Sequence, residues 1–251
     1  MRTTATASLS LRPSLALFGT EPLRAALEYA SHRLRPRAAV AQGDGHPVII
    51  FPGLGADGHA VATLRDHART LGYAATDWGR GFNTGPRGDV DAWIGALAAE
   101  VERQIDASGE PATLIGWSLG GIYARELGKL LGPRRVRQVI TIGTPFNADA
   151  DHSNVGWLFR LLNGSSATID AAMAQRLRTP PPVPTTSIYS RSDGIVAWQT
   201  CCHARRGSRV EDIEVTSSHV GMVWNSDVLN VVADRLAQPA GRWRRYAASP
   251  R

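Results

Sequence analysis

The sequence predicts an α/β fold in which a mostly parallel sheet is flanked by helices. Short apolar runs alternate along the chain with amphipathic segments of helical spacing, and this alternation is typical of such sheets. The runs are continuously apolar, as expected for strands that are covered on both faces. The 251 residues suffice for one substantial hydrophobic core, so one main domain is expected.

The first expected element is a helix over 22–35, because Leu23, Leu27, Ala30 and Leu34 recur at helical spacing. The same criteria identify, in order, strand 46–53, helix 58–72, strand 73–78, helix 89–108, strand 111–117, helix 119–132 and strand 135–145. Strands that run into loops are expected over 185–193 and 210–219, and a last helix over 225–239. The expected N-caps are Asp89 and either Asn225 or Ser226.

Residues 146–184 depart from this alternation. Two short helices are expected over 157–164 and 169–178, followed by the proline-rich segment 179–184. The stretch is interpreted as a small helical insertion over the strand ends, either a lid or a surface excursion without a gating role. The predicted organisation is therefore an N-terminal extension over 1–45, with one helix packed on the domain, and an α/β domain over 46–251.

Composition and charge are those of a globular protein. Hydrophobic residues make up 43% and charged residues 20% of the chain, and the net charge is +6. The arginine clusters are scattered and accompany no recognised nucleic-acid motif, so nucleic-acid binding is not expected. Cys201 and Cys202, the only cysteines, are adjacent and predict no disulfide framework, which favours a reducing compartment. With His203 they form three consecutive residues that cannot easily wrap a metal ion, so no metal is expected.

The N-terminal segment lacks the pattern of a signal peptide. Arg12 and Pro13 interrupt its apolar part, which leaves no sustained hydrophobic region. No run of 18 or more apolar residues occurs, so neither a transmembrane helix nor stable membrane insertion is expected. The default expectation is a cytoplasmic protein, with an unusual export route left open.

The segment Gly116-Trp117-Ser118-Leu119-Gly120 matches the pattern G-x-S-x-G. A serine hydroxyl becomes a useful nucleophile only when a base lies near it and its oxygen is exposed and fixed. A sharp turn from a strand into a helix presents the hydroxyl in this way. The five letters alone are modest evidence, and a plain turn is the alternative. The expected strand before Ser118 and helix after it favour a nucleophile.

A nucleophilic serine in this setting requires an acid and then a histidine, in that order along the chain. Asp193 and His219 both follow expected strands in the required order. His219 would accept the Ser118 proton, and Asp193 would orient and stabilise the imidazolium. Asp193 followed by Gly194 is also an ordinary turn signal. The rival acids are Asp149, Asp151 and Asp227, of which Asp227 lies after the histidine.

The glycine-containing loop over 51–58 follows the first strong strand. It is expected to bring a backbone N–H, that of Leu54, to the negative charge that forms on attack, while Leu119 supplies the second N–H. The alternative is an ordinary glycine-rich loop. A phosphate-binding loop is disfavoured because the pattern G-x-x-x-x-G-K-[ST] is absent, and no cofactor is expected.

Four segments together resemble the α/β-hydrolase superfamily and its bacterial lipase and esterase branch: VIIFPGLGADG, LIGWSLGGIYARELG, YSRSDGIVAW and SSHVGMVWN. The resemblance covers about residues 46–237. It implies a serine hydrolase with Ser118, Asp193 and His219 as the triad and Leu54 and Leu119 as oxyanion-hole positions. Pro52-Gly53 stands where the family usually has His-Gly. The chain is also short of the family's first strands, which implies a reduced sheet.

Apolar residues near the expected site predict an acyl pocket, although at least half of them are expected to be core or lid residues: Leu54, Trp117, Leu119, Phe146, Trp157, Leu158, Phe159, Ile195, Val196, Val220 and Met222. The favoured function is an esterase or lipase acting on a small-molecule or lipid ester. The alternatives are a thioesterase or acyltransferase with the same triad, or a non-catalytic binding protein of this fold. The sequence does not separate acyl-chain lengths.

Overall fold

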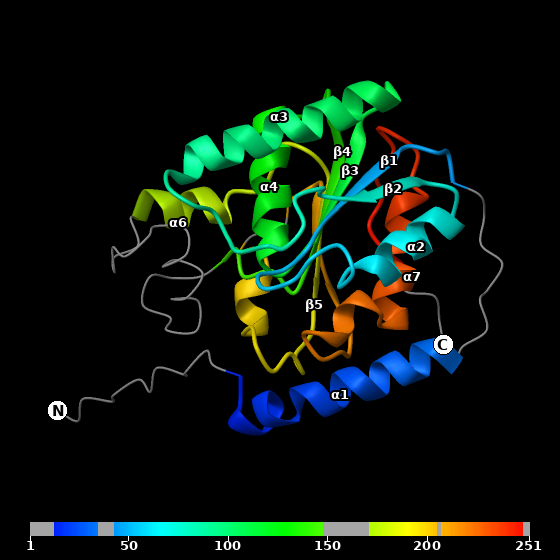
Figure 1. Cartoon of the computed structure of the whole chain (residues 1–251), viewed down its shortest axis with the longest axis vertical. Coiled ribbons are helices and arrows are strands. Elements are labelled where there is room, and N and C mark those ends of the chain that lie inside the picture. Colours follow the sequence, from blue (N-terminus) through cyan, green and yellow to red (C-terminus); the bar gives the residue numbers. More distant parts are fainter. Residues whose placement is uncertain (1–12, 35–42, 148–170, 205–206, 248–251) are drawn as a thin grey trace.

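A computed structural model describes residues 13–34, 43–147, 171–204 and 207–247. Within them lies a six-stranded sheet of order β2-β1-β3-β4-β5-β6. Its strands are β1 (Pro47–Phe51), β2 (Ala74–Asp77), β3 (Ala112–Trp117), β4 (Val136–Ile142), β5 (Thr185–Tyr189) and β6 (Val210–Glu214). Every neighbouring pair is parallel, which confirms the predicted parallel sheet (Figure 1).

Helices cover both faces of this sheet (Figure 1). One face carries α3 (Val90–Ser108), α4 (Leu119–Leu131) and α6 (Ala171–Arg178), and the other carries α2 (Ala62–Thr70) and α7 (Ser226–Leu236). Helix α1 (Leu15–Leu34) lies against the loops that follow β5 and β6. Two 3-10 turns, η1 (Trp198–Cys201) and η2 (Gly221–Val223), belong to the segments after these strands.

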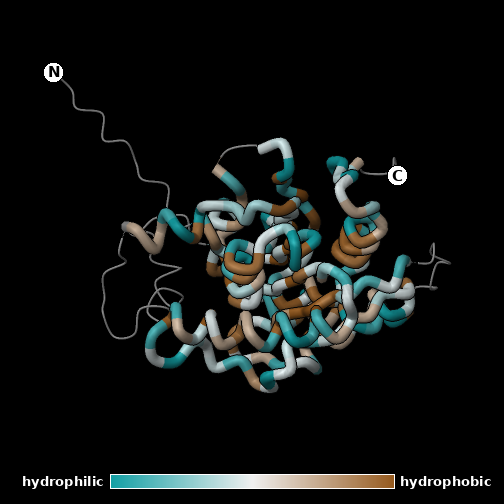
Figure 2. Tube along the Cα trace, turned by 90° about the horizontal axis from the view of Figure 1, so that it is seen from above, coloured by the Kyte–Doolittle hydropathy of each residue, from teal (hydrophilic) through white to brown (hydrophobic). Residues whose placement is uncertain are grey.

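The core has two layers because side chains alternate across the central strands. In β1, Val48 and Ile50 pack towards α2 and α7, whereas Ile49 and Phe51 pack towards α3 and α4. All four side chains are fully buried or nearly so, and each such side chain contributes about 1.5–3 kcal/mol of hydrophobic stabilisation. Seen from above, hydrophobic segments gather in the interior and hydrophilic ones surround them (Figure 2).

Most helices and strands lie within a few residues of their predicted positions. The Asp89 side chain accepts a hydrogen bond from Ala92 N at 2.8 Å, which confirms the predicted N-cap of α3. At α7 the Asn225 side chain accepts from Asp227 N at 2.8 Å, so Asn225 rather than Ser226 is the cap. These caps satisfy N–H groups that have no partner within their own helix.

Helix α1 begins at Leu15 rather than at residue 22. The Ser14 side chain accepts from Leu17 N at 3.2 Å at this earlier start, and Pro22 is accommodated inside the helix. Because proline has no backbone N–H, the carbonyl oxygen one turn earlier in the helix lacks its usual hydrogen-bond donor. The leucines that predicted this helix face outwards, with 63% of Leu23, 62% of Leu27 and 84% of Leu34 exposed.

Only the ends of the predicted insertion belong to the described part of the chain. The helix expected over 169–178 is present as α6, whereas the one expected over 157–164 lies outside the described residues. Glu126 of α4 pairs with Arg176 of α6 at 2.6 Å and with Lys129 at 2.6 Å. In the described ranges, no helix combines the length and apolar character that a membrane crossing requires.

Two glycine-to-alanine substitutions should change stability in opposite directions. A Cβ at Gly121 would overlap the Thr144 side chain, whereas a Cβ at Gly95, inside α3, would meet nothing within 4 Å. Gly121→Ala should therefore lower the free energy of unfolding by about 1–3 kcal/mol, and Gly95→Ala should raise it by about 0.5–1 kcal/mol. Urea denaturation of both variants measures this, and equal effects would contradict the packing at Gly121.

Candidate active site

Ser118 occupies the sharp turn between β3 and α4. Its backbone angles are φ 54° and ψ −122°, and it is the one non-glycine residue with positive φ in the described ranges. A backbone of this kind costs about 1–3 kcal/mol and persists only where the surroundings enforce it. Ser118 N donates to Ile142 O of the neighbouring strand β4 at 2.8 Å, which fixes the serine at the carboxyl edge of the sheet.

The glycines around Ser118 are required by close backbone contacts. A Cβ at Gly116 would overlap the backbone of Gly120 and Gly121, and a Cβ at Gly120 would overlap the carbonyl groups of Phe51 and Pro52. The turn can therefore form only where both positions lack a side chain. The contact at Gly120 also places the loop after β1 directly against the turn that carries Ser118.

Asp193 and His219 are joined by a hydrogen bond of 2.6 Å between Oδ2 and Nδ1. The other carboxylate oxygen, Oδ1, accepts from Ile195 N at 2.8 Å and Val196 N at 2.7 Å, so the acid is held on both sides. An ionised carboxylate only accepts hydrogen bonds, which assigns the proton to Nδ1 and leaves Nε2 as the acceptor nitrogen. Both side chains are almost fully buried.

This bond distinguishes Asp193 from the rival acids. Asp227 lies in the first turn of α7, after the histidine in sequence. Asp149 and Asp151 lie outside the described residues. Of the acids in the described ranges, Asp193 is the one that bonds to the His219 ring.

His219 lies beside the turn that carries Ser118. Trp117 Nε1 donates to His219 O at 3.1 Å, and the two rings are 5.7 Å apart between centroids. Gly143 directly follows Ile142, whose carbonyl accepts the hydrogen bond from Ser118 N. A Cβ at Gly143 would lie 3.1 Å from His219 Nδ1, so this residue contacts the imidazole. The described residues show no hydrogen bond between Ser118 Oγ and His219. These contacts place the bonded Asp193–His219 pair next to the turn that carries Ser118.

The pKa of His219 reflects competing effects. Burial favours the neutral ring and would lower the pKa, but the charge of Asp193 and the hydrogen bond to it favour the imidazolium. A further contribution comes from the carboxylate of Glu21, and together these groups raise the pKa of His219 above its ordinary value of 6.5. The site thus stabilises a positive charge on this ring.

The two predicted oxyanion-hole residues belong to two different segments that adjoin Ser118, the loop after β1 and the start of α4. Leu119 is the first residue of α4, so its N–H has no carbonyl partner within the helix. Leu54 lies in the loop after β1, and the preceding Gly53 is so close that a Cβ there would be 3.2 Å from Ser118 Cβ. The loop after β1 and the start of α4 thus both border the serine, and an oxyanion hole formed by the N–H groups of Leu54 and Leu119 stays a prediction.

Asn83 holds this loop and was missed by sequence reasoning. Its side chain is fully buried; Nδ2 donates to Pro52 O at 2.8 Å, and Oδ1 accepts from Tyr123 Oη at 3.1 Å. Its backbone carbonyl accepts from Gly55 N at 2.8 Å. The sequence around Asn83 is typical of an exposed turn, so no local signal marks this role.

The predicted acyl-pocket residues divide between core and site. Trp117, Leu119, Phe146 and Met222 belong to the two core clusters, in line with the expectation that many would be packing residues. Residues 157–159 lie outside the described ranges. A cavity of about 570 Å³ lies along β6, and its lining includes Tyr189, Cys202 and Tyr246 but none of the candidate site residues.

In the Cys201-Cys202-His203 segment, Cys201 is buried and His203 makes contacts with charged side chains. His203 Nδ1 lies 2.6 Å from Asp212 Oδ1 while its Nε2 lies 3.0 Å from Arg125. Arg125, itself buried, also donates to carbonyl groups at the end of α6, including Leu177 O at 3.1 Å. In the described ranges, no three His, Cys, Asp or Glu residues are grouped so that they could hold a metal ion.

Comparison with solved structures identifies the architecture. Lipase B of Aspergillus fumigatus superposes with a TM-score of 0.59 at 18% identity, over 82% of this chain and 56% of that chain. The monoacylglycerol lipase of Paleococcus ferrophilus gives 0.56 at 12% identity, over 80% and 98%. The mature lipase BlEst2 of Bacillus licheniformis gives 0.57 at 18% identity, over 81% and 96%. This chain has the α/β-hydrolase fold. It spans little more than half of the Aspergillus enzyme.

Sequence comparison adds no narrower assignment, because no protein-family model and no curated protein matches the chain. The identities to the solved α/β-hydrolase structures are low, so the likeness shows the fold alone. In open α/β sheets, ligands bind outside the carboxyl ends of the strands. Ser118, Asp193 and His219 follow β3, β5 and β6 at that edge. Their position and mutual contacts therefore make them the candidate active site.

Removing the Asn83 side chain should loosen the loop after β1. Asn83→Ala leaves Pro52 O without its donor in a buried setting, and unpaired buried polar groups cost about 1–3 kcal/mol each. Tyr123→Phe is the matched control, since it removes only the single bond to Asn83 Oδ1 and should cost about 0.5–1.5 kcal/mol. Thermal and urea unfolding compare the two, and an Asn83→Ala protein as stable as Tyr123→Phe would contradict this assignment.

Proposed function

We propose that this protein is a serine hydrolase that cleaves carboxylic esters through an acyl-enzyme. The observation that carries the proposal is the bonded Asp193–His219 pair, placed beside a serine whose backbone is strained into the positive-φ region. Ser118 is the nucleophile, His219 the general base and Asp193 the residue that orients and stabilises the histidine. Strained backbone at a polar residue is characteristic of functional sites.

The reaction follows from this arrangement. When the ester carbonyl lies against Ser118, Oγ attacks the carbonyl carbon while its proton passes to His219 Nε2. The tetrahedral intermediate collapses as the carbon–oxygen bond to the alcohol breaks, and the imidazolium returns the proton to the departing alkoxide. Water then attacks the acyl-enzyme with the same proton transfers. The acid is released and Ser118 is restored.

Negative charge develops on the carbonyl oxygen during each attack. The N–H groups of Leu54 and Leu119 are proposed to stabilise it, helped by the positive end of the α4 dipole at Leu119. Asn83 supports this function indirectly, because it anchors the loop that contains Leu54. Pro52 at the start of the loop does not impede it, since the donor is a later backbone N–H.

Support for an ester substrate comes from two directions. The side chains of Leu54, Ile195 and Val220, in the loops that carry or adjoin the candidate residues, are partly exposed, and apolar surface suits an acyl chain better than a charged group. Several solved proteins with this fold at low identity are named as lipases or esterases. The substrate is therefore proposed to be a small-molecule or lipid ester.

The nucleophile is tested with a fluorophosphonate probe, which reacts with activated serines. Wild-type protein should be labelled at Ser118, whereas Ser118→Ala should not, and its turnover should fall by roughly 10⁴-fold or more. Hydrolysis is measured with p-nitrophenyl esters from C2 to C16 beside acyl-CoA substrates. Equal labelling of the two proteins would exclude Ser118 as nucleophile, and activity confined to thioesters would exclude the ester assignment.

The pH dependence follows from the raised pKa of His219. The ring must be neutral to accept the serine proton, so kcat/KM should increase with pH and reach half its maximum above pH 6.5, the ordinary pKa. Asp193→Asn should lower kcat by roughly 10⁴-fold, because an amide favours the wrong imidazole tautomer. A pH–rate profile together with single-turnover rates measures both. A profile that stays flat between about pH 5 and pH 8 would argue against His219 as the base.

A further inference from the structure

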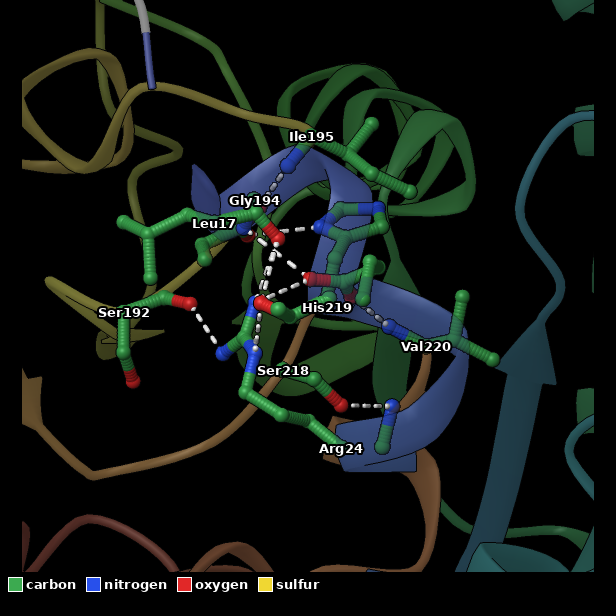
Figure 3. Close-up of polar contacts among 12 residues, drawn as sticks. Leu17, Arg24, Ser192, Gly194, Ile195, Ser218, His219 and Val220 are labelled. Atoms are coloured by element: carbon green, nitrogen blue, oxygen red, sulfur yellow. Dashed lines mark hydrogen bonds and ion pairs between the residues drawn. The ribbon is translucent and has the colours of Figure 1, made fainter. Parts of the chain in front are cut away.

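Helix α1 presents its polar face to the loops of the candidate site (Figure 3). Glu21 and Ala25 are buried there, while Leu23 and Leu27, on the outward side, are 63% and 62% exposed. A helix docked by the hydrophobic effect would instead bury its leucines and expose its charged residues. Polar contacts with the loops after β5 and β6 therefore make up much of the docking of α1.

One carboxylate of α1 bonds to both of these loops. Glu21 Oε2 accepts from Gly194 N at 3.1 Å, and Glu21 Oε1 accepts from Val220 N at 3.0 Å. Gly194 follows Asp193 and Val220 follows His219. A single side chain thus ties together the residues next to the acid and next to the histidine.

Two further residues of α1 bond to the opposite sides of the same pair. Arg24 Nη1 donates to Ser192 O, immediately before Asp193, at 2.6 Å. Glu28 Oε1 accepts from Ser218 N, immediately before His219, at 2.7 Å. Asp193 and His219 are therefore each held on both sides by bonds to one helix, and dashed lines at Ser192, Gly194 and Val220 mark contacts of this kind (Figure 3).

The loops are shaped for this contact. A Cβ at Gly194 would overlap Leu17 O and the Glu21 carboxylate, and a Cβ at Gly221 would overlap the Glu28 carboxylate. The Glu21 charge is compensated by Arg24, whose Nη2 lies 2.7 Å from Oε2. A buried carboxylate without such partners would be strongly disfavoured. The close approach of the glycines and the compensation of the Glu21 charge by Arg24 together indicate a specific contact between α1 and these loops.

We propose that Glu21 is a positioning residue for the Asp193–His219 pair, supported by Arg24 and Glu28. This inference rests on the proposed hydrolase function. By fixing the backbone on both sides of the acid and the histidine, the helix sets the orientation of the imidazole towards Ser118. Small displacements of catalytic groups are costly, since a shift of about 1 Å can lower a rate by roughly 100-fold.

Glu21 also contributes to the charge around the ring. Among the described residues, the charged side chains that bond to His219 or to its loop are Asp193, Glu21 with its partner Arg24, and Glu28. Beyond the effects of burial and Asp193, Glu21 raises the pKa of His219. Replacing Glu21 by a neutral residue should therefore lower that pKa, whereas removing Arg24 leaves Glu21 uncompensated and should raise it.

The test compares Glu21→Gln, Arg24→Gln and Leu27→Gln in the full chain. Gly194 N and Val220 N donate to different oxygens of Glu21, so in Glu21→Gln one of these N–H groups would face the amide NH2 instead of an acceptor. The kcat of this variant should fall by roughly 10- to 100-fold with little change in KM, and the acidic limb of its pH–rate profile should move to lower pH. Arg24→Gln should also lower kcat but move the limb to higher pH. Leu27→Gln, on the exposed side of α1, should behave as wild type.

A folded Glu21→Gln protein with wild-type kcat and an unmoved acidic limb overturns the inference. If Glu21→Gln does not fold, Arg24→Gln provides the test. A folded Arg24→Gln protein with wild-type kcat and an unchanged acidic limb of the pH–rate profile also overturns the inference. Circular dichroism and thermal unfolding establish folding in each case. A wild-type protein that neither hydrolyses esters nor reacts with the fluorophosphonate contradicts the proposed function instead, so the two failures are distinguishable.

Discussion

The strained backbone at Ser118 is the constraint on which the rest of the candidate site depends. It exists because β3 passes directly into α4, and it requires that Gly116 and Gly120 carry no side chains. The strain of about 1–3 kcal/mol is offset by burial of the first turns of α4, where Leu119 and Ile122 are almost wholly inside the core. The absence of a side chain at Gly120 also lets the loop after β1 pack against the turn that carries Ser118. The packing that stabilises the fold therefore also assembles the groups around Ser118.

Residue types alone do not make such a site, as the amino end of the sheet shows. There Asp44 lies 2.5 Å from His46 Nδ1, and His46 Nε2 lies 2.9 Å from Thr113 Oγ1, which is an acid–histidine–hydroxyl series. Thr113, however, is an ordinary residue within β3, paired with Val48. Burial lowers the pKa of His46 despite its hydrogen bond to Asp44, whereas the pKa of His219 is raised. Of these two arrangements, the one at the carboxyl edge combines a hydroxyl presented by a strained turn with a histidine whose charged form is favoured.

The sequence predicted the features that depend on local pattern. The order of strands and helices follows from apolar periodicity, and Ser118, Asp193 and His219 could be selected as candidates because each follows a strand in a fixed order along the chain. Features that depend on distant contacts could not be found. The Asn83 side chain donates to a carbonyl group 31 residues away in the sequence, and Glu21 accepts from an N–H group 173 residues away. Neither residue stands in a distinctive local sequence. Fold and candidate residues were thus accessible, whereas their supporting contacts were not.

Helix α1 illustrates why amphipathic spacing does not reveal which face of a helix is buried. Its leucines predicted the helix correctly, yet its carboxylates make the contacts with the loops after β5 and β6. Those loops contain backbone N–H groups, at Gly194, Ser218 and Val220, that donate not to the sheet but to the carboxylate of Glu21 or Glu28. Buried N–H groups are nearly always paired, so the loops need these acceptors to keep their conformation. Helix α1 therefore completes the hydrogen bonding of the loops that carry Asp193 and His219, and their geometry depends on a segment far from both in the sequence.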